Sequence, residues 1–330
     1  MSIVSTALAL KDLPAPPSDK TGWPWTEQSE SFPERMPDGS EWPRISIVTP
    51  SYNQGQFIEE TIRSVLLQGY PNLEYTIIDG GSTDNSVEII KKYEPWIAYW
   101  VSEKDNGQSH AINKGFQQST GEITNWLCSD DLFLPNALGT VVFKFLLSPD
   151  VGVVVGKAYQ TYENAAGETY KTNTVGPRDE IDIDLMPATH FIPQPSTFYR
   201  RKYLDRSPPV LETYSYAMDF ELWNYFKAKG VSWIIEEEVL SIMRNHESNK
   251  STIREAEMAS ETQLVYREYT HEIIPLTIFY KNIRLPLIEM SHRSNSFWIK
   301  AVIKLLQITY VLILSPFYGL AKVRRMYLCL

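Results

Sequence analysis

Apolar segments of strand length alternate with helical segments from residue 45 to residue 127. Strands that alternate with helices in this way form βαβ units and a largely parallel sheet covered by helices on both faces. We therefore predict an α/β fold with a Rossmann-like, mixed but mostly parallel sheet flanked by helices. The expected strands are residues 45–49, 74–78, 98–101 and 122–127, and the expected helices are residues 56–68, 86–93 and 109–118.

The segments before and after this alternation have different sequence patterns. Residues 1–44 contain seven prolines and little periodicity, which indicates an irregular arm. Tryptophans at 23, 25 and 42 are unusual in a solvated arm, so we expect part of it to pack on the main domain. After residue 149 the alternation loosens into strands near 151–159, 198–199 and 231–235 and a helix near 220–228. This second half is expected to extend the same sheet.

The charge of the chain is unevenly distributed. The formal net charge is −9, which argues against nucleic acid as a partner. From Lys281 to the C-terminus, however, eight basic residues face one acid, Glu289. A basic tail on an acidic body predicts binding to an anionic membrane surface. Residues 305–320 are strongly apolar but shorter than the about 20 residues of a membrane span. An in-plane amphipathic helix, a spanning helix and a docking helix all remain open.

The cysteine content and the N-terminal sequence indicate in which cellular compartment the protein is expected. The two cysteines, Cys128 and Cys329, suggest no disulfide framework and favour a reducing environment. The first ten residues have neither a basic region nor a small-residue cleavage site, so they do not resemble a signal peptide. We expect a cytoplasmic protein, peripherally associated with the inner face of the cell membrane.

Two of the predicted strands are followed by polar loops that suit a ligand. In residues 49–53, Pro50 ends a strand and Tyr52 offers a ring that could stack on a base or simply pack in the loop. In residues 79–84, two glycines permit a sharp turn, and Asp84 can cap the next helix. Asp79 ends an apolar strand, where folding does not need a carboxylate. We expect it to accept a hydrogen bond from a base N–H or a ribose hydroxyl.

The loop after the fourth strand carries two adjacent carboxylates, Asp130 and Asp131. Like charges side by side repel unless a cation or hydrogen bonds compensate them, and oxygen ligands suit Mg²⁺ or Mn²⁺. Capping of the following helix is the alternative for either residue. The three loops lie at one carboxyl edge of the sheet, where open α/β sheets bind ligands. The chain has neither a Gly-x-Gly-x-x-Gly nor a P-loop sequence, which excludes those two nucleotide sites.

Four motifs occur together in a recognisable order: Thr-Pro-Ser-Tyr-Asn at 49–53, Asp-Gly-Gly-Ser-Thr-Asp at 79–84, Asn-Lys-Gly at 113–115 and Ser-Asp-Asp at 129–131. In these motifs the chain resembles family 2 glycosyltransferases with the GT-A fold, over residues 45–251. The resemblance implies inverting transfer of a sugar from a nucleoside diphosphate sugar, most often a UDP-sugar. It also implies a divalent cation, Mn²⁺ or Mg²⁺.

The resemblance assigns donor and cation roles to individual residues. Pro50, Tyr52 and Asp79 would hold the base. Asp130 would be the metal-binding carboxylate, and His246 would return to the metal from late in the domain. The donor contacts would be completed by Asn113, Ser129 and Arg244. Cys128 departs from the pattern, because it replaces the first aspartate of Asp-x-Asp and a thiol suits Mg²⁺ or Mn²⁺ poorly.

On the acceptor side the resemblance implies a catalytic base just before a late helix. Asp219 is the candidate, with Met218 where the family has glutamate; capping of that helix is the alternative role for Asp219. Glu221 would point to another face of the helix and is the weaker candidate. Gln194 is implied as an acceptor-sugar contact.

The expected organisation is an arm (1–44), a GT-A domain (45–251) with a nucleotide-binding half (45–135) and an acceptor half (136–251), and a helical C-terminal region with a membrane-associating tail (252–330). The expected function is glycosyl transfer to a glycan or lipid-linked acceptor in polysaccharide or cell-envelope synthesis. Two alternatives stay open: an impaired, sugar-nucleotide-binding scaffold protein, or a nucleotidyltransferase that forms the sugar nucleotide. The second usually requires a glycine-rich basic loop after the first strand, and Gln54-Gly55-Gln56 is not one.

Overall fold

The computed structural model describes residues 6–164, 168–177, 183, 192–246, 249, 255–270 and seven isolated positions between 302 and 313. The chain divides into two compact units, residues 1–183 with 191–262 and residues 184–190 with 263–330. The first unit holds the sheet and every predicted site residue. Most of the predicted membrane-associating tail lies outside the described residues. Within the described part of the chain, no helix is both long and apolar enough to cross a bilayer.

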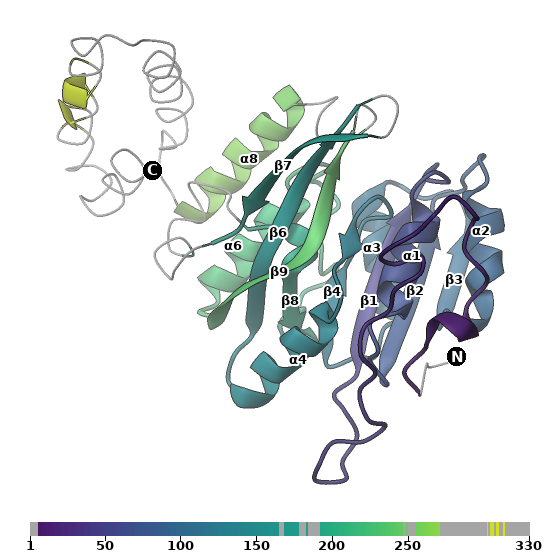
Figure 1. Ribbon diagram of the computed structural model, residues 1–330. Helices are drawn as coiled ribbons and strands as arrows, with labels where there is room; N and C mark the ends of the chain where they lie inside the picture. The colour runs from purple at the N-terminus through teal and green to yellow at the C-terminus, as the bar shows by residue number, and fades with distance from the viewer. Residues whose placement is uncertain are drawn as a thin grey trace. The chain divides into compact units, whose positions relative to one another are not determined.

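The first half of the domain alternates strands and helices as predicted (Figure 1). Its elements are β1 (Ile45–Ser51), α1 (Ile58–Leu66), β2 (Leu73–Asp79), α2 (Ser86–Tyr93), β3 (Tyr99–Ser102), α3 (Gln108–Gln118), β4 (Ile123–Trp126), β5 (Leu132–Phe133) and α4 (Ala137–Leu147). The second half contains β6 (Val153–Glu163), β7 (Thr169–Val175), β8 (Thr197–Arg200), α6 (Met218–Ala228), β9 (Trp233–Asn245) and α8 (Glu255–Thr270). Short 3₁₀ turns occupy Leu10–Asp12, Glu94–Trp96, Gln194–Ser196 and Arg201–Tyr203.

One mixed sheet runs through both halves, in the order β3-β2-β1-β4-β8-β6-β9-β5, with β7 added beside β6. Strands β1 to β4 are mutually parallel, and β6 pairs with β9 in parallel. The remaining pairs, which involve β5, β7 and β8, are antiparallel. The predicted α/β fold with a mixed sheet is confirmed, and its parallel character is concentrated in the first half.

Strand β9 extends ten residues beyond the segment that the sequence predicted. Three consecutive glutamates, Glu236–Glu238, interrupt its apolar pattern and form an irregularity in the pairing with β6. Two of these charges have partners: Glu236 pairs with Lys144 at 2.9 Å and Glu237 with Lys157 at 2.5 Å. The extension carries Arg244 and then His246 back to the loop that follows β4.

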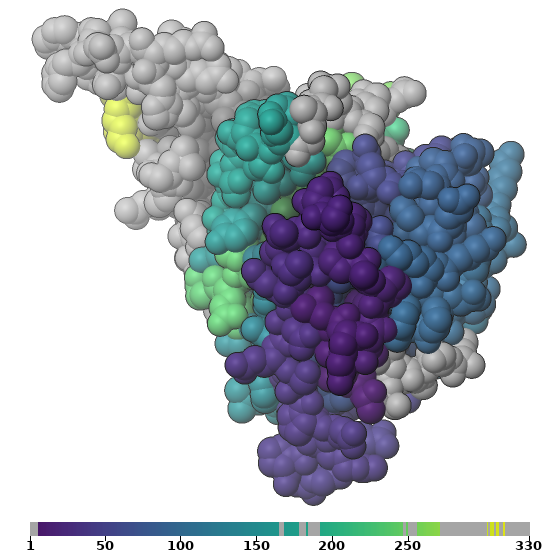
Figure 2. Space-filling view, turned by 45° about the vertical axis from the view of Figure 1, so that its right-hand side comes forward, coloured from purple at the N-terminus to yellow at the C-terminus, as the bar shows by residue number. Residues whose placement is uncertain are grey.

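The N-terminal arm packs on the domain, as the tryptophans predicted. Trp25 and Trp42 are buried, and the Trp23 indole N–H donates to the Phe133 carbonyl at 2.8 Å. The fully buried Arg63 of α1 donates to the Pro24 and Trp25 carbonyls, both at 3.0 Å. Figure 2 shows the dark purple N-terminal segment lying across this face.

Candidate functional site

The carboxyl ends of the parallel strands align at one edge of the sheet. In the strand register Ser51 lies opposite Asp79, and Asp79 lies opposite Ser102. Strand β4 ends at Trp126 and leads directly into the Cys128–Asp131 loop. The polar loops that the sequence singled out therefore meet at the edge where parallel sheets bind ligands.

Asp79 organises the loop that follows β2. It is fully buried, and its Oδ2 accepts hydrogen bonds from the Gly81 N–H (3.1 Å), the Ser82 N–H (2.8 Å) and the Ser102 hydroxyl (2.7 Å). Its Oδ1 accepts the Ser82 hydroxyl at 2.5 Å. The expectation that folding does not need this carboxylate is wrong, because it holds the turn together. Oδ1 has one bond among the described residues, and a carboxylate oxygen can accept another from a ligand.

The loop after β1 is fastened to the Asp79 loop. The Asn53 N–H donates to the Ser82 hydroxyl, and the Asn53 side chain accepts the Thr83 N–H, both at 2.8 Å. Pro50 is buried within β1, whereas Tyr52 is 61% exposed. An exposed ring on a fixed loop is available for stacking by a planar ligand.

Cys128, Asp130 and Asp131 converge in the loop after β4. One sulfur or carboxylate oxygen from each lies within 4.8 Å of the others. Burial and the charge of Asp130 raise the pKa of Asp131, against the lowering effect of the Arg244 N–H at 3.0 Å and of its charge. Burial and the carboxylates of Asp131, Asp130 and Asp219 raise the pKa of Cys128. So much negative charge in one buried place favours a bound cation.

His246 lies beside Asp130, with Nε2 at 3.3 Å from Oδ2. It is 8% exposed, and its ring stacks on Phe57 with 4.5 Å between centroids. The structure thus brings together the two residues predicted as metal ligands. The carboxylate oxygen of Asp130 fits Mn²⁺ or Mg²⁺, whereas the Cys128 thiol does not.

Arg244 reaches the same loop, but protein groups occupy its guanidinium. Nη2 contacts Glu60 at 2.7 Å, Nε contacts Glu163 at 3.2 Å, and Nη1 donates to the Asp130 carbonyl at 3.2 Å. A contact between Arg244 and a diphosphate would therefore require an exchange of partners. In this structure Arg244 supports the Asp130 loop.

Helix α6 places Asp219 above the same loop. Trp223, one turn further along α6, is buried and stacks on Trp126 with centroids 5.9 Å apart. Asp219 shares the helix face of Trp223, and Cys128 lies two residues beyond Trp126. The charge of Asp219 accordingly acts on the Cys128 thiol. The alternative role of Asp219 as an N-cap is wrong, because the helix begins at Met218 with Ala217 as its cap residue.

Glu221 points to another face of α6, as expected. It is fully buried and forms a two-pronged ion pair with Arg206, one contact of which measures 2.7 Å. A carboxylate held in this way is unsuited to take a proton from an acceptor.

Two predicted ligand contacts, Asn113 and Gln194, instead have protein partners. The buried Asn113 amide donates to the Val210 carbonyl (2.8 Å) and Glu212 (3.1 Å) and accepts the Val210 N–H (2.9 Å). The Gln194 amide nitrogen donates to the Trp126 carbonyl at 2.6 Å. The structure gives Asn113 a role in fixing a loop, and Gln194 lies at the site with only its oxygen directed to Cys128, at 3.9 Å. Ser129 is also buried, and its carbonyl accepts the Thr61 hydroxyl at 2.9 Å.

Sequence reasoning missed several residues around the site. Phe57 and Glu60 hold His246 and Arg244 across almost two hundred residues, a pairing that no local pattern reveals. Gln108 donates to the Cys128 sulfur at 3.2 Å. Asp105 lies so close to Gly80 that a Cβ there would be 2.8 Å from its Oδ2. For Asp105 and Gln108 a signal existed, since both follow the third strand at the same sheet edge.

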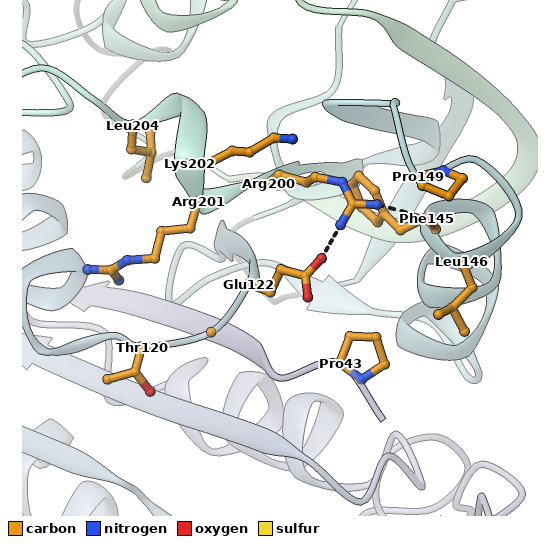
Figure 3. Close-up of a pocket in the computed structure, with 11 residues that line it drawn as sticks. Pro43, Thr120, Glu122, Phe145, Leu146, Pro149, Arg200, Arg201, Lys202 and Leu204 are labelled. Atoms are coloured by element: carbon orange, nitrogen blue, oxygen red, sulfur yellow. Dashed lines mark hydrogen bonds and ion pairs between the residues drawn. The ribbon is translucent and has the colours of Figure 1, made fainter. Parts of the chain in front are cut away.

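A cavity of about 820 Å³ lies at the opposite edge of the sheet (Figure 3). Its residues are Pro43, Thr120, Gly121, Glu122, Phe145, Leu146, Pro149, Arg200, Arg201, Lys202 and Leu204. Arg200 is tied to Glu122 and to the Val151 and Phe145 carbonyls, so its charge supports the fold. The cavity is separated from the candidate site by the length of β4, and no predicted residue lines it.

Comparison with known proteins agrees with this geometry. Residues 46–207 match the profile of a family described as "Glycosyl transferase family 2". An uncharacterized glycosyltransferase of Rickettsia typhi is 29% identical over 210 residues, which cover 62% of this chain and 65% of that protein. One from Nostoc sp. is 30% identical over 180 residues, which cover 51% and 54%. The chain thus spans less than two thirds of the length of these relatives.

Solved structures resemble the fold at low sequence identity. The mannosyltransferase PcManGT of Pyrobaculum calidifontis, in complex with GDP-Man and Mn²⁺, gives a TM-score of 0.53 at 17% identity and covers 86% of both chains. S. aureus TarS 1–349, in complex with UDP-GlcNAc, gives 0.51 at 14% identity, covering 86% of this chain and 90% of TarS 1–349. These likenesses show a GT-A-like fold.

Proposed function

Through residues 46–207 the chain belongs to glycosyl transferase family 2, and on this premise we propose that it transfers a sugar from a nucleoside diphosphate sugar to an acceptor hydroxyl with inversion. One observation carries the proposal. Asp130 and His246 from one side, and Asp219 from the other, converge on the loop that follows β4. A candidate cation site and a candidate base thereby lie at the same edge of the sheet.

The donor is a nucleoside diphosphate sugar, with UDP as the expected nucleotide. Tyr52 would stack on the base, and Asp79 would accept a base N–H or ribose hydroxyl through Oδ1. The exposure of Tyr52 and the remaining acceptor capacity of Asp79 support this placement. The UDP-GlcNAc bound by TarS and the GDP-Man bound by PcManGT are consistent with a donor of this class.

Asp130 and His246 would hold the divalent cation, Mn²⁺ or Mg²⁺. When bound, such an ion neutralises the charge that develops on a departing diphosphate. Asp131 would not be a ligand of this ion, because its side chain accepts the Arg244 N–H. The Mn²⁺ in the PcManGT complex supports the choice of ion.

Asp219 would take the proton from the acceptor hydroxyl. Its carboxylate accepts the Phe220 N–H through Oδ1 at 2.7 Å, and Oδ2 would be the oxygen that faces the acceptor. Proton transfer by a positioned carboxylate contributes about 10² to 10⁴ in rate. We expect Asp219→Asn to lower turnover by at least about a hundredfold while leaving donor affinity unchanged.

A thermal-shift panel of nucleotide sugars, with and without Mn²⁺, tests the donor and the cation together, because ligands that bind the folded state raise its melting temperature. A transfer assay with the best donor then compares Asp219→Asn with Asp205→Asn, an exposed acid that bonds to Tyr225 and Lys229. Unchanged turnover in Asp219→Asn would remove Asp219 as the base. Donor binding without transfer in the unaltered protein would favour a sugar-nucleotide-binding scaffold role.

The acceptor would be a glycan or lipid-linked glycan, and the basic C-terminal segment would bring the enzyme to the cytoplasmic membrane face. The charge of about +7 from Lys281 onward supports this part of the proposal. Co-sedimentation with anionic vesicles, compared between the full chain and a version ending at residue 280, measures it. Equal sedimentation of both proteins would contradict the role of the tail.

A further inference from the structure

Helix α1 presents a polar face to the interior. Thr61, Ser64 and Gln68 lie on one side of this helix and the residues just after it, and all three side chains are fully buried. Buried polar groups are costly unless they are hydrogen-bonded. Ser64 and Gln68 each donate to a carbonyl of α1 itself, and the other partners of the three side chains all lie in one stretch of chain, between Ser129 and Leu138.

The three side chains bond to successive parts of that stretch. The Thr61 hydroxyl donates to the Ser129 carbonyl at 2.9 Å and to the Asp131 carbonyl at 2.8 Å. Ser64 Oγ accepts the Phe133 N–H at 3.2 Å. Gln68 donates to the Leu134 carbonyl at 2.9 Å and accepts the Leu138 N–H at 3.2 Å. Only Thr61 reaches the Asp130 loop itself.

Thr61 holds the two residues that flank Asp130. A single hydroxyl shared between the Ser129 and Asp131 carbonyls fixes both peptides against α1. The Asp130 side chain then has a set direction, toward His246 at 3.3 Å. Repulsion between Asp130 and Asp131 acts to spread the loop, so a fixed backbone is needed for both carboxylates to stay near one point.

The adjacent residue of α1 acts on the same loop from another side. Glu60 pairs with Arg244 at 2.7 Å, and Arg244 donates to the Asp130 carbonyl at 3.2 Å. The carbonyls of residues 129, 130 and 131 are therefore all bonded to α1 or to a side chain that α1 holds.

We propose that Thr61 is a positioning residue for the cation site, acting through the backbone of the Asp130 loop and touching neither cation nor sugar. The proposal rests on the proposed function in one respect, namely that Asp130 binds a cation. Groups that orient metal ligands typically change metal affinity by about 10- to 100-fold when they are removed. Thr61 is expected to act in this range.

The test compares two substitutions at Thr61 with one at Ser64. Thr61→Val keeps the shape and removes the hydroxyl, whereas Thr61→Ser keeps the hydroxyl. Ser64→Ala removes a hydroxyl of the same helix face that bonds to the Thr61 carbonyl within α1 and to the Phe133 N–H beyond the loop, and that has no bond to residues 129–131. Mn²⁺ binding is measured from the signal of free Mn²⁺ in electron paramagnetic resonance, with UDP present. Melting temperatures verify that each variant is folded.

We expect Thr61→Val to weaken Mn²⁺ binding by at least about tenfold, with Thr61→Ser restored to within about twofold of the unaltered protein. Ser64→Ala should lower the melting temperature and leave Mn²⁺ affinity unchanged. If Thr61→Val and Ser64→Ala lower the melting temperature alike and neither changes Mn²⁺ binding, Thr61 is merely structural and the proposal is overturned.

A second measurement reports the loop position without a cation. The Cys128 thiol lies in the same loop and is partly exposed, so its alkylation rate follows the loop backbone. Cys329 is replaced by serine in every protein used. Faster alkylation in Thr61→Val, but not in Thr61→Ser or Ser64→Ala, supports the positioning role. This holds even if the unaltered protein binds no Mn²⁺, because the absence of Mn²⁺ binding would count against the proposed cation and not against the position of the loop. Equal alkylation rates in all variants would overturn the positioning role.

Discussion

The loop of Asp79 and the loop of Asp130 and Asp131 lie at the same edge of the sheet, and the negative charges of their carboxylates are compensated in different ways. Asp79 is buried among four hydrogen-bond donors that come from its own loop and from β3. Asp130 and Asp131 lie together beside a thiol, and burial, followed by the charge of neighbouring carboxylates, raises the pKa values of Asp131 and Cys128. The first loop is held by its own hydrogen bonds, and only Oδ1 of Asp79 keeps room for a further one. The second has negative charge that its protein partners do not balance.

The difference separates a residue that shapes a site from residues that await a ligand. Hydrogen bonds from fixed N–H groups stabilise a carboxylate permanently and make the loop rigid. Adjacent carboxylates with few donors favour a bound cation, since it removes the repulsion that folding created. The same residue type thus has different consequences at the ends of β2 and β4, two strands on either side of β1, and substitutions should separate them.

The largest effect is expected from Asp130→Asn. The amide keeps the shape but removes one charge of the cation site, so the contact from His246 no longer meets a carboxylate. We expect kcat/KM for transfer to fall by at least about a hundredfold, with a melting temperature close to that of the unaltered protein. Transfer assays across a range of Mn²⁺ concentrations measure it. A variant that reaches full activity at high Mn²⁺ would show that Asp130 sets cation affinity and nothing further.

Asp79→Asn should instead lower stability. Asparagine replaces one acceptor oxygen of Asp79 by an NH₂ group, which is a donor and faces the N–H and hydroxyl donors of the loop. A buried donor left without an acceptor lowers the free energy of unfolding by about 1 to 3 kcal/mol. Urea unfolding measures this loss. Ser102→Ala, which removes one of the four donors, provides the graded control and should cost about 1 kcal/mol. If Asp79→Asn left stability unchanged, Asp79 would resemble Asp130 and the contrast between the loops would fail.

The contrast also marks what the sequence could reveal. The strand–helix alternation and the polar strand ends at 49–53, 79–84 and 129–131 are local patterns, and they predicted the sheet edge and three of its loops. The hydrogen-bond and ion-pair partners of the site residues could not be predicted from the sequence, because they depend on which strands become neighbours. Asp79 meets Ser102 only through the β2–β3 register, and Arg244 meets Glu60 only because β9 continues past three glutamates.

The same reason explains the residues whose environment differed from expectation. Asn113 belongs to the Asn-Lys-Gly motif, yet its amide forms hydrogen bonds with the backbone of Val210, almost a hundred residues away. For Asp219, capping stayed open beside the predicted role as base, because the start of the helix could not be placed to within one residue from the sequence. Trp223 stacked on Trp126 fixes that helix, and this contact is not local.

The smallest effect is expected from Asp131→Asn, measured without a cation as a melting temperature against pH. Burial and Asp130 raise the pKa of Asp131 in the folded state, so folding favours its protonated form. Stability of the unaltered protein should therefore fall as pH rises from the ordinary aspartate pKa, about 3.9, through the raised value. Asparagine keeps an oxygen for the Arg244 N–H but cannot ionise, which removes that fall and raises the melting temperature at neutral pH by on the order of 2 °C. Added Mn²⁺ should stabilise the unaltered protein more than the variant, because the charge of Asp131 lies beside the ion that Asp130 and His246 would hold, whereas asparagine carries no charge. A variant less stable than the unaltered protein at neutral pH without cation would mean that the second loop, like the first, is already balanced by its hydrogen bonds.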